Sequence, residues 1–212
     1  RYTLKNPFVN IVVGRPKHSL KVCSPEQVAK VEKFIRSPKS DPEAAMMLAL
    51  IFYFGLKIKE MTYATLEFTG ENHGGMKIIF HRAELSYGSS RYTRDQVLTL
   101  PIESAWFLSL QKRFRIQWQE KFKKIRADLP RQPLILDPRG WHNRPVITLT
   151  VRNIYYKNII AATGVRVLPN VLRCSGADLL SHQGGTGTLQ RIGWSKAYAF
   201  NFTWMPRQFF RP

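Results

Sequence analysis

A nearly uninterrupted apolar stretch over residues 44–56 sets the first condition on how this chain can fold. A helix that is apolar on all sides has to be enclosed by other elements or by lipid. The stretch holds 13 residues, whereas a membrane-spanning helix needs about 20. We therefore predict that it forms the central helix of a protein core, and we expect no membrane among the partners of the chain.

Start and stop signals delimit this helix and the one before it. Residues 24–27 combine an N-cap serine, a first-turn proline and a capping-box glutamine, which predicts a helix to about residue 35. Residues 41–43 repeat the device before the apolar helix, and Gly55 is expected to end or kink it near residue 54. A short turn or helix is expected next, over residues 57–61.

The rest of the chain is predicted to be a small sheet followed by helices. Strand-like segments at residues 66–69, 76–81 and 96–100 predict an antiparallel three-stranded sheet with long hairpin loops. The fold class is therefore mixed α+β and mainly helical. After the sheet we expect a basic amphipathic helix over 104–126 and a loop over 130–145. A second helix is expected over 151–163, with Thr150 as its N-cap and Gly164 at its end. A third helix over 170–182, a glycine-rich loop over 183–187 and short helical pieces from residue 189 complete the prediction.

Positive charge dominates the composition. The chain has 33 Lys and Arg against 14 Asp and Glu, a net charge of +19, while 44% of its residues are hydrophobic. That apolar content excludes a disordered basic tail. Residues 1–22 hold five basic residues and no acid, and residues 139–212 hold ten against the single Asp178. We interpret residues 1–22 as a basic linker or arm, and we expect residues 23–212 to form one domain.

This charge distribution favours a polyanionic partner. The basic face of residues 104–126, taken alone, is better explained as a solvated helix surface. Together with the acid-free segments it favours nucleic acid over a membrane surface, because the basic residues fall on several separated elements. Cys23, Cys174 and the five histidines have no disulfide or metal-site spacing. We accordingly expect no metal, no cofactor and a reducing, cytoplasmic location.

Four short motifs, in order, resemble the catalytic domain of the tyrosine recombinase or phage integrase family over nearly the whole chain. Residues 6–8 with the basic residues after them, followed by residues 24–27, resemble the family linker and its first catalytic-domain helix. Residues 54–61 resemble the first arginine motif of the family, usually Gly-Leu-Arg-Ile-x-Glu-Leu. Residues 171–173 match the end of the His-x-Leu-Arg box, and residues 193–195 match the segment that precedes the nucleophilic tyrosine. The resemblance implies that the family's separate amino-terminal domain is absent here.

The resemblance also implies a chemistry. In the family a tyrosine attacks a DNA phosphodiester, while two arginines, a lysine and a His or Trp stabilise the transition state. Arg173 stands at the second arginine and Trp194 at the His-or-Trp position, whereas Lys57 replaces the first arginine and Asn170 the histidine. Lysine keeps the charge but loses the bidentate fork, and asparagine cannot titrate. Glu60 occupies the acidic position that supports the first arginine.

The nucleophile position is where the family pattern fails. The tyrosine usually follows the His-or-Trp residue by about nine, which gives Thr203 here. Tyr198 is only one helical turn past Trp194, so we interpret it mainly as a packing residue and otherwise as the alternative nucleophile. For the hairpin lysine, Arg91 or Arg94 is the nearest basic residue. The implied DNA-binding residues are Lys57, Arg91, Arg94, Arg144 and Arg173.

Three functions are compatible with these observations. The first is a nucleoid-associated protein that binds duplex DNA through a recombinase-like domain lacking strand cleavage, beside an active recombinase or self-associated through its aromatic C-terminal segment. The second is an active recombinase that uses Tyr198. The third is a basic RNA-binding protein whose likeness to recombinases is accidental. For residues 171–173 taken alone, the simplest interpretation is a helix start with an exposed arginine, and for Trp194 a core aromatic.

Overall fold

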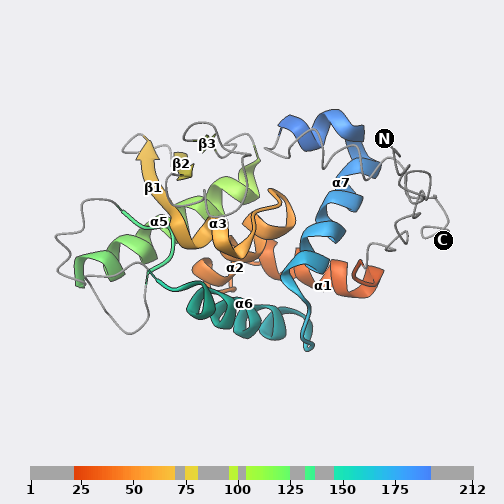
Figure 1. Cartoon of the computed structure of the whole chain (residues 1–212), viewed down its shortest axis with the longest axis horizontal. Helices are drawn as coiled ribbons and strands as arrows, with labels where there is room; N and C mark the ends of the chain where they lie inside the picture. Colours follow the sequence, from red (N-terminus) through yellow and green to blue (C-terminus); the bar gives the residue numbers. More distant parts are fainter. Residues whose placement is uncertain are drawn as a thin grey trace, which may run out of the picture.

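The structure, a computed structural model, describes residues 22–69, 75–80, 96–99, 104–124, 132–136 and 146–191, with side chains except those of residues 80, 96, 99 and 181–191. This part of the chain consists of helices packed around α2, with one small sheet on one side of the molecule (Figure 1). The elements are α1 (Pro25–Arg36), α2 (Pro42–Phe52), α3 (Ile58–Tyr63), β1 (Ala64–Thr69), β2 (Gly75–Phe80), β3 (Gln96–Thr99), α5 (Ala105–Lys124), α6 (Thr148–Thr163) and α7 (Pro169–Arg191).

The apolar helix is the centre of the core, as predicted. Every residue of α2 from Ala44 to Phe52 is buried. The helix begins with the Asp41 carboxylate, which accepts a hydrogen bond from the backbone N–H of Ala44 at 2.8 Å. It ends two residues earlier than expected, and Gly55 follows with a φ of 68°, in the left-handed region that favours glycine. The chain thereby turns sharply into α3.

The sheet has the order β1-β2-β3 with antiparallel pairing throughout. Leu66 of β1 pairs with Ile78 of β2, which pairs with Leu98 of β3. The segment 132–134, expected to be a plain loop, adds to the outer edge of β1. There the Leu66 N–H donates to the Gln132 carbonyl at 2.7 Å and the Leu134 N–H donates to the Ala64 carbonyl at 2.9 Å. These bonds satisfy edge groups that a terminal strand would otherwise expose.

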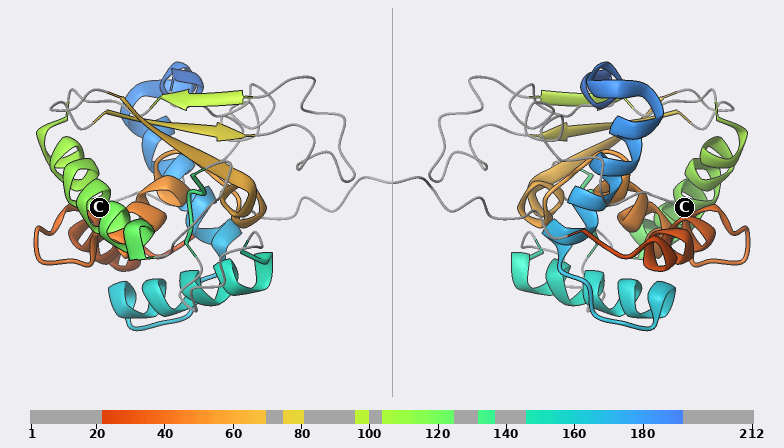
Figure 2. Two further views of the ribbon diagram at one scale, coloured as in Figure 1. Left: turned by 90° about the vertical axis from the view of Figure 1, so that its left-hand side faces the viewer. Right: turned by 90° about the vertical axis from the view of Figure 1, so that its right-hand side faces the viewer.

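Long helices enclose α2 from several sides. The buried face of α5 consists of Phe107, Leu110, Phe114 and Trp118, at the predicted spacing of three and four. Helix α6 contributes Val151, Tyr155 and Ile159 to the same core. Figure 2 shows that α6 and the sheet lie on opposite sides of the molecule. The predicted fold class, mainly helical with a three-stranded antiparallel sheet, is confirmed.

Two predictions about the last helices are wrong. Helix α6 begins at Thr148, with Ile147 as its N-cap, so Thr150 lies inside the first turn and does not cap it. The expected loop over residues 183–187 belongs to α7, which is continuous to Arg191. Glycine lowers helix propensity by about 1 kcal/mol. An established helix can absorb this cost because each added residue contributes a backbone hydrogen bond.

Candidate functional site

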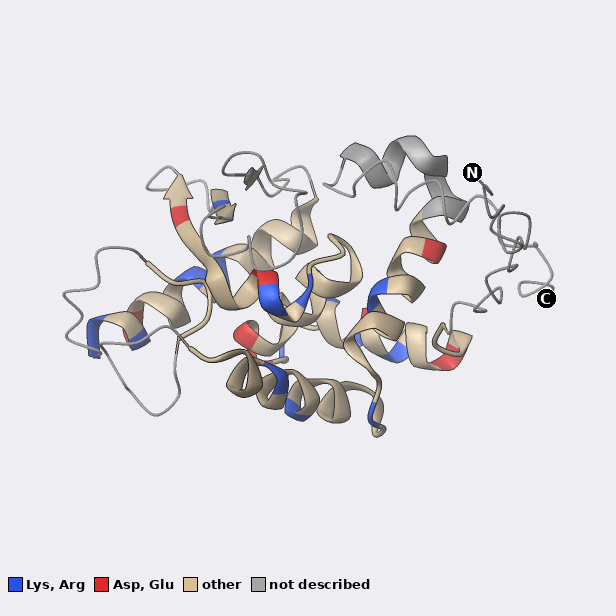
Figure 3. Ribbon diagram, in the orientation of Figure 1, with Lys and Arg blue, Asp and Glu red and all other residues tan. Residues whose placement is uncertain are grey.

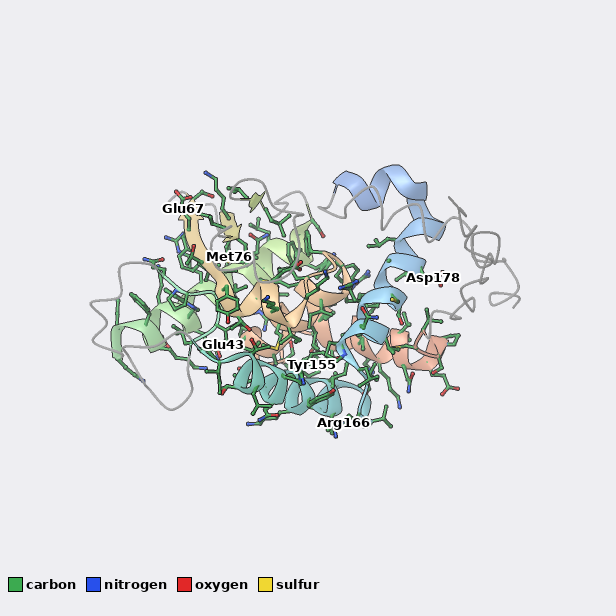
Figure 4. All side chains as sticks on the ribbon, viewed as in Figure 1. Glu43, Glu67, Met76, Tyr155, Arg166 and Asp178 are labelled. Atoms are coloured by element: carbon green, nitrogen blue, oxygen red, sulfur yellow. The ribbon has the colours of Figure 1, made fainter. Side chains whose placement is uncertain are left out.

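Arg173 is the most unusual charged residue in the described part of the chain. It lies in the second turn of α7 and is only 4% exposed. Its neighbours Leu172, Cys174 and Ser175 are also buried, and Asp178, labelled in Figure 4, is buried further along the same helix. Arginine is almost never buried without interaction partners, and Arg173 does interact within the molecule. The interpretation of Arg173 as a merely exposed helix residue is therefore wrong.

The position of Arg173 depends on a close crossing of α7 over the end of α2. A methyl group added to Gly176 would overlap the carbonyl oxygen of Phe52, so only glycine permits this approach. Residues three apart lie on the same side of a helix. Arg173 therefore lies on the side of α7 that packs against α2. The motif at residues 171–173 lies on α7, which packs against α2, and the motif at residues 54–61 follows α2 in the chain (Figure 1).

Lys57 lies at the start of α3, just beyond this crossing, and is exposed. Its backbone N–H donates to Oε2 of Glu60 at 2.8 Å. Glu60 therefore fixes the first turn of α3, which positions the backbone at Lys57. Asn170 lies in the first turn of α7 and is exposed. Trp194, Tyr198, Arg91, Arg94 and Arg144 lie outside the described residues.

A contact that the sequence did not predict joins the entry of the domain to α7. The backbone N–H of Cys23 donates to Oγ of Ser175 at 2.7 Å, and this hydroxyl donates to the Val171 carbonyl at 2.9 Å. Burial raises the pKa of both Cys23 and Cys174 thiols. The neutral thiol is a weak nucleophile, so these cysteines are structural. Residues so distant in sequence give no local signal of such a bond.

Two tyrosines, Tyr155 in the core and the partly buried Tyr53 beside it, are held by hydrogen bonds. The Tyr155 hydroxyl donates to the Val167 carbonyl at 3.0 Å, and burial raises the pKa of this phenol strongly. The Tyr53 hydroxyl donates to Oε1 of Glu32 at 2.9 Å, and burial raises its pKa to about 12. A nucleophilic tyrosine needs a phenol that can lose its proton near neutral pH. Tyr53 and Tyr155 are accordingly packing residues.

Part of the basic cluster on α5 stabilises the fold. The Arg113 guanidinium donates to the carbonyls of Ser37, Pro38 and Ser40 at 2.8–3.1 Å. Arg115 lies 5.2 Å from the ring centre of Phe68, and Lys121 forms an ion pair with Glu43 at 2.6 Å. These three basic residues are thus engaged within the fold and differ from the solvated helix face expected for the cluster, whereas Lys112, Lys123 and Lys124 are exposed. None of the helices in the described part has the length and apolar character needed to cross a bilayer.

The mainly helical architecture with one three-stranded antiparallel sheet matches the tyrosine recombinase fold. Among solved structures with this fold is that of XerA recombinase, which matches 92% of this chain with a TM-score of 0.59 and 16% sequence identity. The chain spans 64% of the length of that structure. No family model and no curated protein matches the sequence.

Proposed function

We propose that this chain is a DNA-binding domain of the recombinase type that lacks strand cleavage. The proposal is carried by Arg173, a buried guanidinium held at the crossing of α2 and α7 within a recombinase fold. A guanidinium can donate two hydrogen bonds to one phosphate. The net charge of +19 supplies the long-range attraction that nucleic-acid binding requires. Lys57, exposed beyond the same crossing, would contact the phosphate backbone.

The loss of cleavage is inferred from the residues that replace the catalytic set. At the positions where the family has its first arginine, its histidine and its nucleophilic tyrosine, this chain has Lys57, Asn170 and Thr203. Removal of one transition-state donor already costs roughly 10²-fold or more in rate. Such a domain would serve as an architectural or regulatory subunit beside a recombinase that does cleave. It would then be found with DNA in the cytoplasm.

DNA binding is tested by comparing a labelled DNA duplex with a structured RNA of equal charge, at salt concentrations from about 50 to 200 mM. We expect the duplex to bind more tightly, with a steep loss of affinity as salt rises. Arg173→Lys keeps the positive charge but removes the planar guanidinium that can donate two parallel hydrogen bonds to a phosphate. We expect this variant to bind the duplex about tenfold more weakly. The matched control is Arg166→Lys, because Arg166 is exposed and lies over Tyr156 away from the crossing.

Because Arg173 is buried, Arg173→Lys could also destabilise the fold. The affinities are therefore compared only after thermal melts show that this variant unfolds at the same midpoint as the wild type. Lys57→Ala changes an exposed side chain and provides the second test. We expect it to reduce the slope of log affinity against log salt by about one. Equal binding by wild type, Arg173→Lys and Lys57→Ala would contradict the proposed site. Preference for the RNA would favour the RNA-binding alternative.

The absence of cleavage is tested separately with a nicked DNA substrate that traps a covalent protein–DNA intermediate. We expect no covalent adduct from the wild-type chain. An adduct that disappears in Tyr198→Phe would contradict this part of the proposal and would identify the chain as an active recombinase. The binding result is independent of this outcome, because it does not depend on the nucleophile.

A further inference from the structure

Exposed apolar side chains gather on α6 and its flanks. Seven large hydrophobic residues are exposed in the described part of the chain, and five of them lie between residues 147 and 168. Leu149 and Ile160 lie within about 20° of each other around the helix at ~100° per residue. Proteins rarely gather exposed apolar side chains on one surface unless that surface binds something. The five residues, which we call the α6 surface, are Ile147, Leu149, Ile160, Val165 and Leu168.

The charged residues of α6 itself and of the segment that follows it are all basic. No Asp or Glu occurs between residues 146 and 177, and Figure 3 shows basic but no acidic residues on α6. Arg152 and Lys157 are exposed on α6 itself. Arg166 lies 4.0 Å from the ring centre of Tyr156, and Figure 4 places it at the outer edge of the molecule. A partner that covers this surface therefore has to carry negative charge.

A cavity borders α6 on the side facing α2 and α5. Its volume is about 830 Å³, within the range of ligand-binding pockets. Met46, Met47, Leu136 and Ile154 provide apolar walls. The charged lining consists of Asp41, Glu43, Lys121, Lys124 and Lys157. Lys121 is paired with Glu43, and Asp41 accepts hydrogen bonds from Ala44 and Gln117, which leaves Lys124 and Lys157 as the ammonium groups a partner would meet. Lys157 is thus shared between the cavity and the exposed side of α6. Bulky apolar side chains of a partner would fit this cavity while acidic groups meet the lysines.

We propose that the α6 surface and this cavity bind an acidic amphipathic helix of another protein. Nucleic acid fits the surface poorly, because aliphatic side chains offer no hydrogen bonds to phosphates. A second copy of this chain also fits poorly, because two chains of +19 repel each other. An amphipathic helix supplies apolar side chains on one face and carboxylates on its borders. The inference does not depend on DNA binding, because Lys57 and Arg173 lie on other elements.

The test uses a fluorescein-labelled helical peptide of about 18 residues, ~27 Å long, with Leu along one face and Glu on the other. We expect saturable binding in fluorescence anisotropy. Leu149→Asp and Ile160→Asp should each weaken it at least about tenfold, and Lys157→Glu about fivefold. The matched control is Ile116→Asp, because Ile116 on α5 is just as exposed, at 59%. Hydrogen exchange should show protection of α6 amides by the peptide.

Several results would overturn this proposal. The first is that the wild-type chain shows no saturable binding of the peptide, and the second is that Ile116→Asp weakens binding as much as Leu149→Asp. Equal binding of a peptide with Lys in place of Glu would show nonspecific apolar contact. Complete competition by duplex DNA would assign the surface to nucleic acid. Thermal melts of each variant establish that the affinity changes do not arise from unfolding.

Discussion

Gly176 is the residue on which the position of Arg173 depends most directly. We expect Gly176→Ala to lower the free energy of unfolding by about 3 kcal/mol, because the added methyl group overlaps the Phe52 carbonyl and the helices must separate. Urea denaturation measures the change. The control is Gly164→Ala, where nothing lies within 4 Å and only the positive φ of 79° is strained. That variant should lose about 1–2 kcal/mol, and an equal loss in both would contradict the close crossing.

Tyr53 provides a pH-dependent contribution to stability. Burial raises its pKa in the folded state to about 12, from the ordinary tyrosine value of 10.0. The unfolded chain therefore loses the proton first, so this contribution is complete below pH 10 and is lost as the pH rises toward 12. We expect the difference in unfolding free energy between wild type and Tyr53→Phe to shrink by about 2 kcal/mol over this range. Urea denaturation at three alkaline pH values measures it, and a constant difference would contradict the burial of this phenol.

At the scale of elements, side chains of α5 hold the turn between α1 and α2 through hydrogen bonds. Arg113 binds the three carbonyls after α1, and Nε2 of Gln117 donates to Asp41 at 2.7 Å. We expect Arg113→Ala to cost about 1–2 kcal/mol in urea denaturation, since three charge-assisted hydrogen bonds to partly exposed carbonyls are lost. Lys112→Ala, on the exposed side of the same helix, should change stability by less than about 0.5 kcal/mol. Equal effects of the two substitutions would contradict the structural role of Arg113.

The elements also show which local signals in the sequence were sufficient. The N-caps at Ser24 and Asp41 and the left-handed Gly164 are local devices, and the structure contains them as predicted. Residues 183–187 have the composition of a loop, yet they continue α7. Neither this continuation nor the pairing of residues 132–134 with β1 could be predicted, because both depend on what precedes or faces the segment in space.

For the whole molecule, the sequence predicted the class of fold but only part of the candidate site. The order of the motifs indicated a recombinase-like domain, and the fold agrees. The burial of Arg173 and its approach to the end of α2 depend on the packing of Gly176, which has no signature in the sequence. The α6 surface was missed for a similar reason. An apolar residue in a sequence does not indicate whether a partner element covers it.

The bond between Cys23 and Ser175 has a mechanical consequence. The chain enters the domain attached to the same helix that carries Arg173. Any tension or docking event that acts on the residues before Val22 would be transmitted to α7 through this bond. If Arg173 binds a phosphate as proposed, the affinity for that phosphate would then depend on how the backbone is held at Cys23.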